Sequence, residues 1–137
     1  MPYEELQHTA DWSLRVWAAD ITSLFVEAAK GMYALAGIKL TGNPRVKRKF
    51  TSSAPDIESM LVSFLTELVY FIERDNLAFD YFDPNIDLDH SIPFRMSTIL
   101  RGARIQSMDK AIKAVTFHNL RIKHTGRGYE VEIVFDV

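Results

Sequence analysis

Hydrophobic residues recur at helical spacing in the first half of the chain, between Asp20 and Gly37. On a helix they form one apolar stripe, made of Ile21, Leu24, Phe25, Ala28, Met32, Leu35 and Ala36. The Asp20 carboxylate can accept hydrogen bonds from the free N–H groups of the first turn. Gly37 can adopt the left-handed conformation with which many helices end. The segment is therefore predicted to be an amphipathic helix.

A second and broader apolar stripe follows in residues 53–75, SAPDIESMLVSFLTELVYFIERD. Ser53 precedes Asp56 by three residues. This is the spacing of a capping box, with Asp in place of the usual Glu or Gln, and Pro55 suits a first helical turn. The stripe consists of Ile57, Met60, Leu61, Phe64, Leu65, Leu68, Phe71 and Ile72. It predicts a second helix that is more deeply buried than the first.

Most of the remaining chain alternates apolar and polar residues, which is the pattern of half-buried strands. One such segment, SLRVWAA, precedes the first helix, and a short one with a cationic face lies within GNPRVKRKFTS, between the helices. Those after the second helix are NLAFDYFDPNIDLD, SIPFRMSTILRGAR, AIKAVTFHNLRIKH and GYEVEIVFDV. The glycines of TGRG predict a tight hairpin connection before the last of them.

This order of elements, with two helices early and most strands late, predicts an α+β fold. A mixed or antiparallel sheet covered on one face by both helices is favoured over a doubly wound α/β fold. A chain of 137 residues has the size of one domain with one core. We therefore expect residues 1–137 to form a single domain.

Composition and charge narrow the class of protein. The chain is 47% hydrophobic and 25% charged, as in ordinary globular proteins. Its net charge of −2 disfavours tight binding of RNA or DNA through phosphate neutralisation. The absence of cysteine excludes disulfides, thiolate metal sites and cysteine nucleophiles. Because the sequence has neither a signal peptide nor a membrane span, we expect a cytoplasmic protein with no membrane partner.

The last strand brings two carboxylates together at the end of the sequence. Alternation places Asp136 on the face opposite to Phe135 and Val137. The terminal carboxylate of Val137 can turn toward the Asp136 side chain. Hard oxygen donors of this kind suit Ca²⁺, Mg²⁺ or Mn²⁺, with a third ligand and some waters. In the alternative interpretation both carboxylates are only solvated at the end of a sheet.

Four residues elsewhere are candidates for the same site or its surroundings. Asp11 lies just before the first strand and can be a third ligand, a cap or a solvated charge. His8 can be a ligand, a residue that orients a ligand, or a surface histidine. Lys113 can hold an anion or cover the sheet with its aliphatic stem. Alternation places His118 on one face with the aliphatic residues that follow it, where a hydrogen-bonded core or boundary histidine is commoner than a ligand.

Two charged segments are not predicted to be sites. DYFDPNIDLDH lacks the spacing of an EF-hand loop and is interpreted as a solvated turn. The basic run Arg45, Lys47, Arg48 and Lys49 can touch RNA phosphates, yet such a run beside a proline is usually a solvated face. The sequence contains no phosphate-binding glycine loop, nucleophile elbow or H-E-x-x-H motif.

Four segments in this order resemble the archease family over essentially the whole chain. They are HTADWSLRVWA, LFVEAAKGMYALAG, DIESMLVSFLTELVYFIERDNLAF, and IKAVTFHNLRI followed by the terminal VEIVFDV. The resemblance implies an accessory protein, itself no enzyme, that assists the RtcB-type GTP-dependent RNA ligase in tRNA splicing and RNA repair. It would promote guanylylation and multiple turnover of that ligase. We expect it to contact RNA only indirectly or weakly.

The resemblance also implies a divalent-metal site, with Ca²⁺ as the expected ion and Mg²⁺ or Mn²⁺ as alternatives. Its ligands, carried onto this sequence, are Asp11, Asp136 and the terminal carboxylate of Val137. The residues expected to orient this site or contact the ligase are His8, Lys113 and His118. Such a site requires a chain that ends at its last ligand, because an extension would turn the terminal carboxylate into an amide. Many family members have a small, glycine-containing run where this sequence has Trp12 and Ser13.

Two other classes of function stay open. A stand-alone RNA-binding or chaperone-like module would use the basic run, and its RNA affinity would fall steeply with salt. A metal-dependent hydrolase around Asp11, His8 and Asp136 would need an open coordination position and a substrate pocket. The sequence shows neither an obvious pocket nor a standard hydrolase motif.

Overall fold

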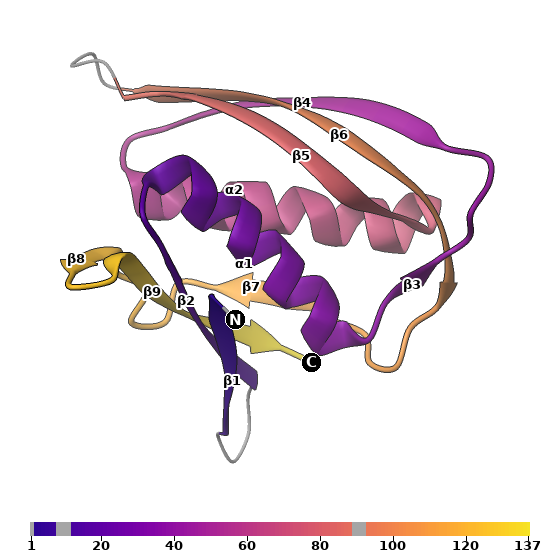
Figure 1. The fold of residues 1–137 in the computed structure, drawn as a ribbon, viewed down its shortest axis with the longest axis horizontal. Helices are drawn as coiled ribbons and strands as arrows, with labels where there is room; N and C mark the ends of the chain where they lie inside the picture. The colour runs from indigo at the N-terminus through magenta and orange to yellow at the C-terminus, as the bar shows by residue number, and fades with distance from the viewer. Residues whose placement is uncertain (1, 8–11, 89–92) are drawn as a thin grey trace.

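Two antiparallel sheets lie on opposite sides of the helices in this computed structural model (Figure 1). It describes residues 2–7, 12–88 and 93–137. The strands of the first sheet, in spatial order, are β1 (Tyr3–Gln7), β2 (Trp12–Ala18), β9 (Gly128–Asp136) and β7 (Ala114–Thr116), and β8 (Lys123–Thr125) also pairs with β9. In the second sheet the central strand β6 (Phe94–Ser107) pairs with β3 (Lys39–Leu40), β4 (Val46–Ala54) and β5 (Leu77–Asp87). The helices therefore form the middle of three layers.

Helix α1 (Ile21–Ala36) begins and ends where the sequence predicts. The Asp20 carboxylate accepts a hydrogen bond from the Ser23 N–H at 2.8 Å. Gly37 adopts the left-handed conformation, with φ 66° and ψ 38°. The helix contacts β2 in the first sheet and β5 in the second, which is why one apolar stripe is not covered by a single sheet.

Helix α2 (Ile57–Tyr70) is capped by Asp56 and not by the predicted Ser53. The Asp56 carboxylate accepts from the Ser59 N–H at 2.6 Å, whereas Ser53 lies in β4, which stays paired with β6 as far as Ala54. The helix continues as a π-helix, η1 (Phe71–Asp75). The prediction of deeper burial for α2 is wrong, because seven of its 14 residues are buried and eight of 16 are buried in α1.

The α+β class is confirmed, and the strands divide between two sheets. Strand β1 was not predicted, because its segment YEELQ is mostly polar. The segment 111–124 was expected to be one strand and forms two short ones, β7 and β8, which pair with different parts of β9. Gly126 and Arg127 connect β8 to β9 as a two-residue hairpin turn, as TGRG predicts.

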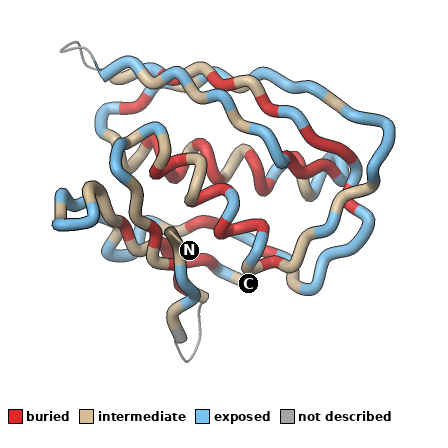
Figure 2. Tube along the Cα trace, in the orientation of Figure 1, coloured by how far each residue is buried: buried red, intermediate tan, exposed pale blue. Residues whose placement is uncertain are grey.

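One hydrophobic cluster joins the three layers. Figure 2 shows buried residues along the helix sides and strand segments that face each other. Phe64 of α2 lies near the centre of this cluster. Its ring centroid is 5.9 Å from that of Phe25 in α1, and 6.4 and 6.2 Å from those of Phe50 and Phe82 in the second sheet. The core therefore connects both sheets through the helix layer.

Candidate functional site

The end of β9 is held between two neighbouring strands of the first sheet. Trp12 of β2 pairs with Phe135, and Ala114 of β7 pairs with Asp136. The Lys113 N–H also donates to the Asp136 carbonyl oxygen at 2.7 Å. The backbone that leads to the last residue is therefore fixed from both sides.

Side chains alternate along β9 as the sequence predicts. Ile133 and Phe135 are fully buried, and Asp136 is exposed. Val137 is half-buried and packs against the core. The exposed Asp136 carboxylate thus directly follows the buried Phe135 ring in the chain. The core and the neighbouring strands hold the backbone of this segment in place.

Two lysines lie on the segment that leads into β7. The Lys110 ammonium lies 3.3 Å from the centroid of the Trp12 ring, a cation–π contact. The N–H groups of Asp109 and Lys110 both donate to the Ala36 carbonyl oxygen, at 2.9 and 3.1 Å, and so attach this segment to the end of α1. Lys113 has an exposed side chain.

His8 and Asp11, which were predicted for this site, lie outside the described residues. The register places Trp12, which follows Asp11 in the chain, opposite Phe135, which precedes Asp136. Within residues 2–7, 12–88 and 93–137, no three His, Asp or Glu side chains are grouped so that they could hold a metal ion. The divalent-metal site and its ligand set stay predictions.

The structure places His118 in a turn after β7, not on the face of a strand. Strand β7 ends at Thr116, which pairs with Val134, so the chain beyond it runs away from Asp136. His118 is exposed, and its Nε2 atom lies 3.3 Å from Nδ2 of Asn119. The predicted strand face for His118 is therefore wrong, and its contact with the ligase stays a prediction.

Comparison with known proteins identifies the family of this chain. The model of the Archease protein family (MTH1598/TM1083) matches residues 3–137. The chain belongs to the archease family. Protein archease of Methanopyrus kandleri is 28% identical over 141 residues, which cover 100% of both chains. Protein archease of Methanosarcina mazei is 27% identical over 139 residues, which cover 98% of this chain and 95% of the relative.

Two solved structures have the same fold as this member of the archease family. The solution structure of Methanobacterium thermoautotrophicum protein 1598 superposes with a TM-score of 0.73 at 19% identity, over 99% of both chains. The crystal structure of a Thermotoga maritima archease, described as a possible chaperone, gives a TM-score of 0.68 at 19% identity. It covers 98% of this chain and 96% of the other. These matches confirm the α+β fold predicted from the order of helices and strands in the sequence.

Trp12, which departs from the glycine-containing run of many archeases, has a packing role in this chain. Its ring is half-buried, packs against the core and carries the Lys110 ammonium on one face. No sequence pattern pointed to Lys110, because the contact joins residues that are far apart in the chain. Only the pairing of β2 with β9 and the attachment of the 109–110 segment to α1 bring the two side chains together.

Residues 80–87 of the acidic segment that was interpreted as a solvated turn belong to strand β5, so that interpretation is wrong in their secondary structure, and residues 89 and 90 lie outside the described residues. Asp80, Asp83 and Asp87 lie in this strand and are exposed. Both carboxylate oxygens of Asp80 accept hydrogen bonds from the Arg45 guanidinium, at 2.5 and 3.0 Å. This bidentate contact with Arg45 lowers the pKa of Asp80 below its usual range.

Helices give no sign of membrane insertion in the described part of this archease. Neither the length nor the hydropathy of any helix there is sufficient to cross a bilayer. The cytoplasmic location stays a prediction.

Proposed function

We propose that this chain is an accessory protein that activates a GTP-dependent RNA ligase of the RtcB type in tRNA splicing and RNA repair. It promotes guanylylation of the ligase and its multiple turnover, and it joins no RNA ends by itself. The observation that carries this proposal is the family match over residues 3–137, which includes both the N-terminal HTADW motif and the terminal VFDV.

The site of this activity is the end of β9. Asp136 is exposed at the end of a paired strand, and the Val137 side chain packs against the core, which supports a terminal carboxylate of restricted mobility. Asp11 is the third proposed ligand, since the β2–β9 register pairs Trp12 with Phe135. Carboxylate oxygens are the donors that Ca²⁺ prefers, and Mg²⁺ and Mn²⁺ accept them too. The residues therefore fit a hard divalent cation.

Such an ion supplies positive charge that offsets the negative charge developing when GTP is attacked at its α-phosphate. The chain's own residues hold and present that charge. The β7 ladder pairs with Asp136 and the β2 ladder with the preceding Phe135, and the exposed Lys113 lies one residue before Ala114, the strand partner of Asp136. Lys113, His8 and His118 are proposed as residues that orient the site or contact the ligase.

The test is multiple-turnover RNA ligation by an RtcB-type ligase of the same organism, with GTP and a divalent ion. We expect stimulation by the wild-type chain and by Glu132→Gln, a charge-neutralising change on the same face of β9. We expect no stimulation by Asp136→Asn, although its thermal unfolding should match that of the control variant.

Two results would count against the proposal in different ways. Normal stimulation by Asp136→Asn rules out the carboxylate site while leaving the ligase as partner. No stimulation by the wild-type chain, with a ligase that is active for one turnover, removes the ligase-activating function itself.

A further inference from the structure

The outer face of the second sheet carries a set of polar and cationic side chains. They have no part in the site proposed at the terminal carboxylates. Strand pairing arranges this face in four rows across β4, β6 and β5. Along the sheet, the rows are Lys47, Arg101 and Tyr81; Lys49, Ile99 and Asp83; Thr51, Ser97 and Asn85; and Ser53, Arg95 and Asp87. The intervening residues face the helices, as the buried Met96, Thr98 and Leu100 of β6 show. We call these twelve residues the outer face.

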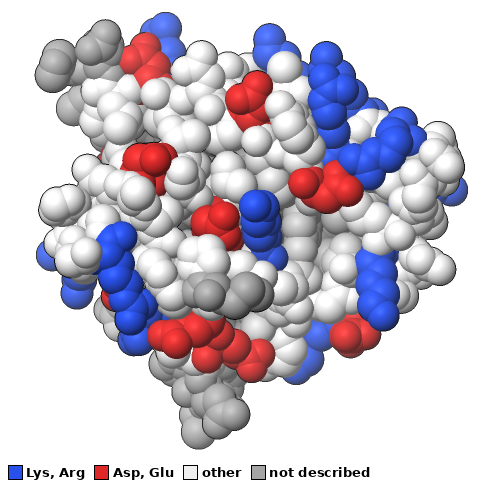
Figure 3. All heavy atoms as spheres, viewed as in Figure 1, with Lys and Arg blue, Asp and Glu red and all other residues white. Residues whose placement is uncertain are grey.

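One end of the outer face is cationic and contains an exposed aromatic ring. Lys47 and Arg101 are neighbours across the β4–β6 ladder. The Arg101 guanidinium carbon lies 5.7 Å from the centroid of Tyr81, whose side chain is 47% exposed. Among the described residues, Lys47, Lys49 and Arg101 have no acidic partner within ion-pair distance. In Figure 3 several Lys and Arg side chains lie at the upper right, where this end of the sheet lies in Figure 1, and others are spread over the rest of the view.

This arrangement separates the basic run into residues with different surroundings. Arg45 is paired with Asp80, and the Arg48 guanidinium donates to the Lys47 carbonyl oxygen at 2.9 Å. Lys47 and Lys49 remain on the outer face, where strand pairing adds Arg101. The cationic surface therefore consists of Lys47, Lys49 and Arg101, and it differs from the basic run in the sequence.

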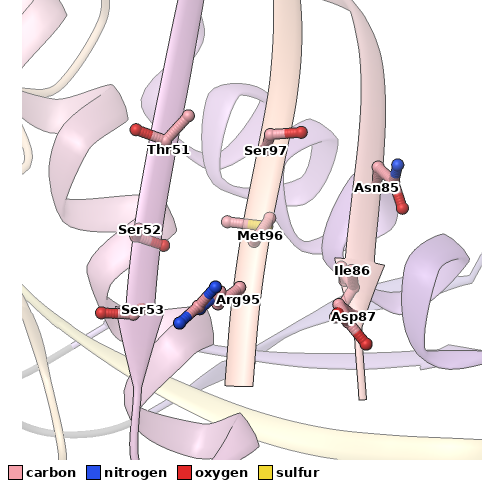
Figure 4. A pocket seen from close by; sticks show the side chains of 9 residues that line it. All are labelled: Thr51, Ser52, Ser53, Asn85, Ile86, Asp87, Arg95, Met96 and Ser97. Carbon is pink, nitrogen blue, oxygen red and sulfur yellow. The ribbon is translucent and has the colours of Figure 1, made fainter. Parts of the chain in front are cut away.

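The other end of the outer face is a hollow of about 710 Å³, lined by hydroxyl, amide and guanidinium groups, by the Asp87 carboxylate and by the apolar side chains of Ile86 and Met96 (Figure 4). Thr51, Ser97 and Asn85 cross it as one row. In the next row the Arg95 side chain extends toward Ser53. The hydroxyl, amide and guanidinium groups can all form hydrogen bonds with sugars and base edges.

We infer that the outer face binds a single-stranded polynucleotide. Successive outward residues of one strand are about 7 Å apart, and neighbouring strands about 4.8 Å, so Lys47, Lys49 and Arg101 form a small cationic patch on a flat support. Aromatic rings beside such cations provide stacking platforms for bases in proteins that bind single strands. Tyr81 provides that ring, and the polar rows continue the path beyond it.

An acidic peptide is the competing occupant, and it explains less of the surface. Its carboxylates would pair with the lysines and Arg101, yet they would leave the exposed Tyr81 ring without a stacking partner. Asp83 and Asp87 on the same face, together with a net charge of −2, make any polyanion bind weakly. The inference does not rest on the proposed ligase activation, since it can be tested without any ligase.

The test is fluorescence anisotropy with end-labelled single-stranded RNA and DNA of one sequence and about ten nucleotides, a length within known site sizes. Three phosphate contacts predict that log K falls with log salt with a slope of about −2. Affinity should therefore fall about 20-fold between 50 and 200 mM salt. The double variant Lys47→Glu/Lys49→Glu should bind at least about tenfold more weakly.

The matched control is Lys30→Glu/Lys123→Glu, which makes the same change in net charge at exposed lysines outside the outer face. It should retain most of the affinity. Tyr81→Leu should bind about tenfold more weakly, while Tyr81→Phe, which keeps the ring, should bind like the wild-type chain. Thermal unfolding of each variant checks that it is folded.

Equal weakening by both double variants would overturn the inference, because binding would then follow net charge alone. It would also be overturned if Tyr81→Leu bound normally and polyglutamate competed as well as RNA, which would assign the surface to an acidic peptide. Undetectable binding at 50 mM salt would exclude the site outright. A stronger response to RNA than to DNA would identify which of the two polynucleotides is the ligand.

Discussion

The terminal end of β9 and the outer face of the second sheet differ in the sign of their charge and in how their side chains are held. At the end of β9, the exposed Asp136 carboxylate follows Phe135, whose backbone is paired on both sides, and precedes Val137, which is half-buried against the core. On the outer face, long cationic side chains stand on an uncovered sheet. The net charge of −2 does not reveal this difference, because it sums the charges of the whole chain.

The two proposals therefore assign different ligands to the two regions. A metal ion needs a few oxygen donors in fixed positions, which a doubly paired strand end can provide. A polynucleotide needs several weakly oriented cations and a ring for stacking, which a flat sheet can provide. Rigidity is essential to the first region, whereas screening by salt should matter mainly for the second.

The largest effect should come from Phe64→Ala, because this substitution disrupts the hydrophobic core that supports both regions. This ring touches aromatic residues of α1 and of the second sheet within one core. We expect a loss of about 3–5 kcal/mol in the free energy of unfolding, measured by urea denaturation in a single transition. Tyr70→Ala, at an exposed position of the same helix, is the control and should have little effect. Two separate transitions would show that the regions fold independently.

Calcium should distinguish the two regions, because we expect it to bind only at the end of β9. An ion that binds the folded chain stabilises it by about 2.7 kcal/mol at about 100 times its Kd. We expect Ca²⁺ to stabilise the wild-type chain and the Lys47→Glu/Lys49→Glu variant alike, but not Asp136→Asn, and EDTA to reverse the effect. Calorimetry with and without Ca²⁺ measures this. An unchanged calcium effect in Asp136→Asn would contradict the assignment of that carboxylate.

Gly102→Ala should damage the second sheet selectively. A methyl group at Gly102 of β6 would collide with the carbonyl oxygen of Ala78 and lie 2.7 Å from Cα of Phe79 in β5. We expect a loss of about 1–3 kcal/mol in unfolding free energy, as for other overpacked sites. Polynucleotide binding should weaken, since Arg101 directly precedes Gly102 in β6. The stabilisation by Ca²⁺ should remain. Gly42→Ala, where an added methyl group meets no atom within 4 Å, is the control.

The smallest effect concerns the Arg45–Asp80 pair beside the cationic end. Arg45→Met should raise the pKa of Asp80 toward its ordinary value, which an NMR titration of the carboxyl group would follow. Because the folded-state pKa of Asp80 is lowered, the pair stabilises the fold above the unfolded pKa, and this contribution is lost as pH falls through the folded pKa. Both side chains are about half exposed, so the change in stability should be small. An unchanged titration would contradict the bidentate contact as the cause.

The helices and the last strand could be predicted because their signals are local. The caps of α1 lie within a few residues of its ends, and alternation along β9 is visible in a nine-residue stretch. The second capping residue was misplaced by three positions, because Ser53 and Asp56 both suit an N-cap and only the pairing of β4 with β6 decides between them.

Pairing partners that are distant in the chain could not be predicted in the same way. The position of Lys110 on Trp12 depends on the course of the segment between α1 and β7. The proximity of Lys47, Arg101 and Tyr81 depends on the register of three strands. Alternation alone also extended the strand past Thr116 to His118, because it carries no information on where pairing with β9 stops.

The most direct measurement compares the chain ending at Val137 with one that carries a single added glycine, in multiple-turnover ligation by the RtcB-type ligase. We expect the chain ending at Val137 to stimulate ligation and the extended chain not to, while both unfold at the same temperature without Ca²⁺. Equal stimulation by both chains would contradict a role for the terminal carboxylate.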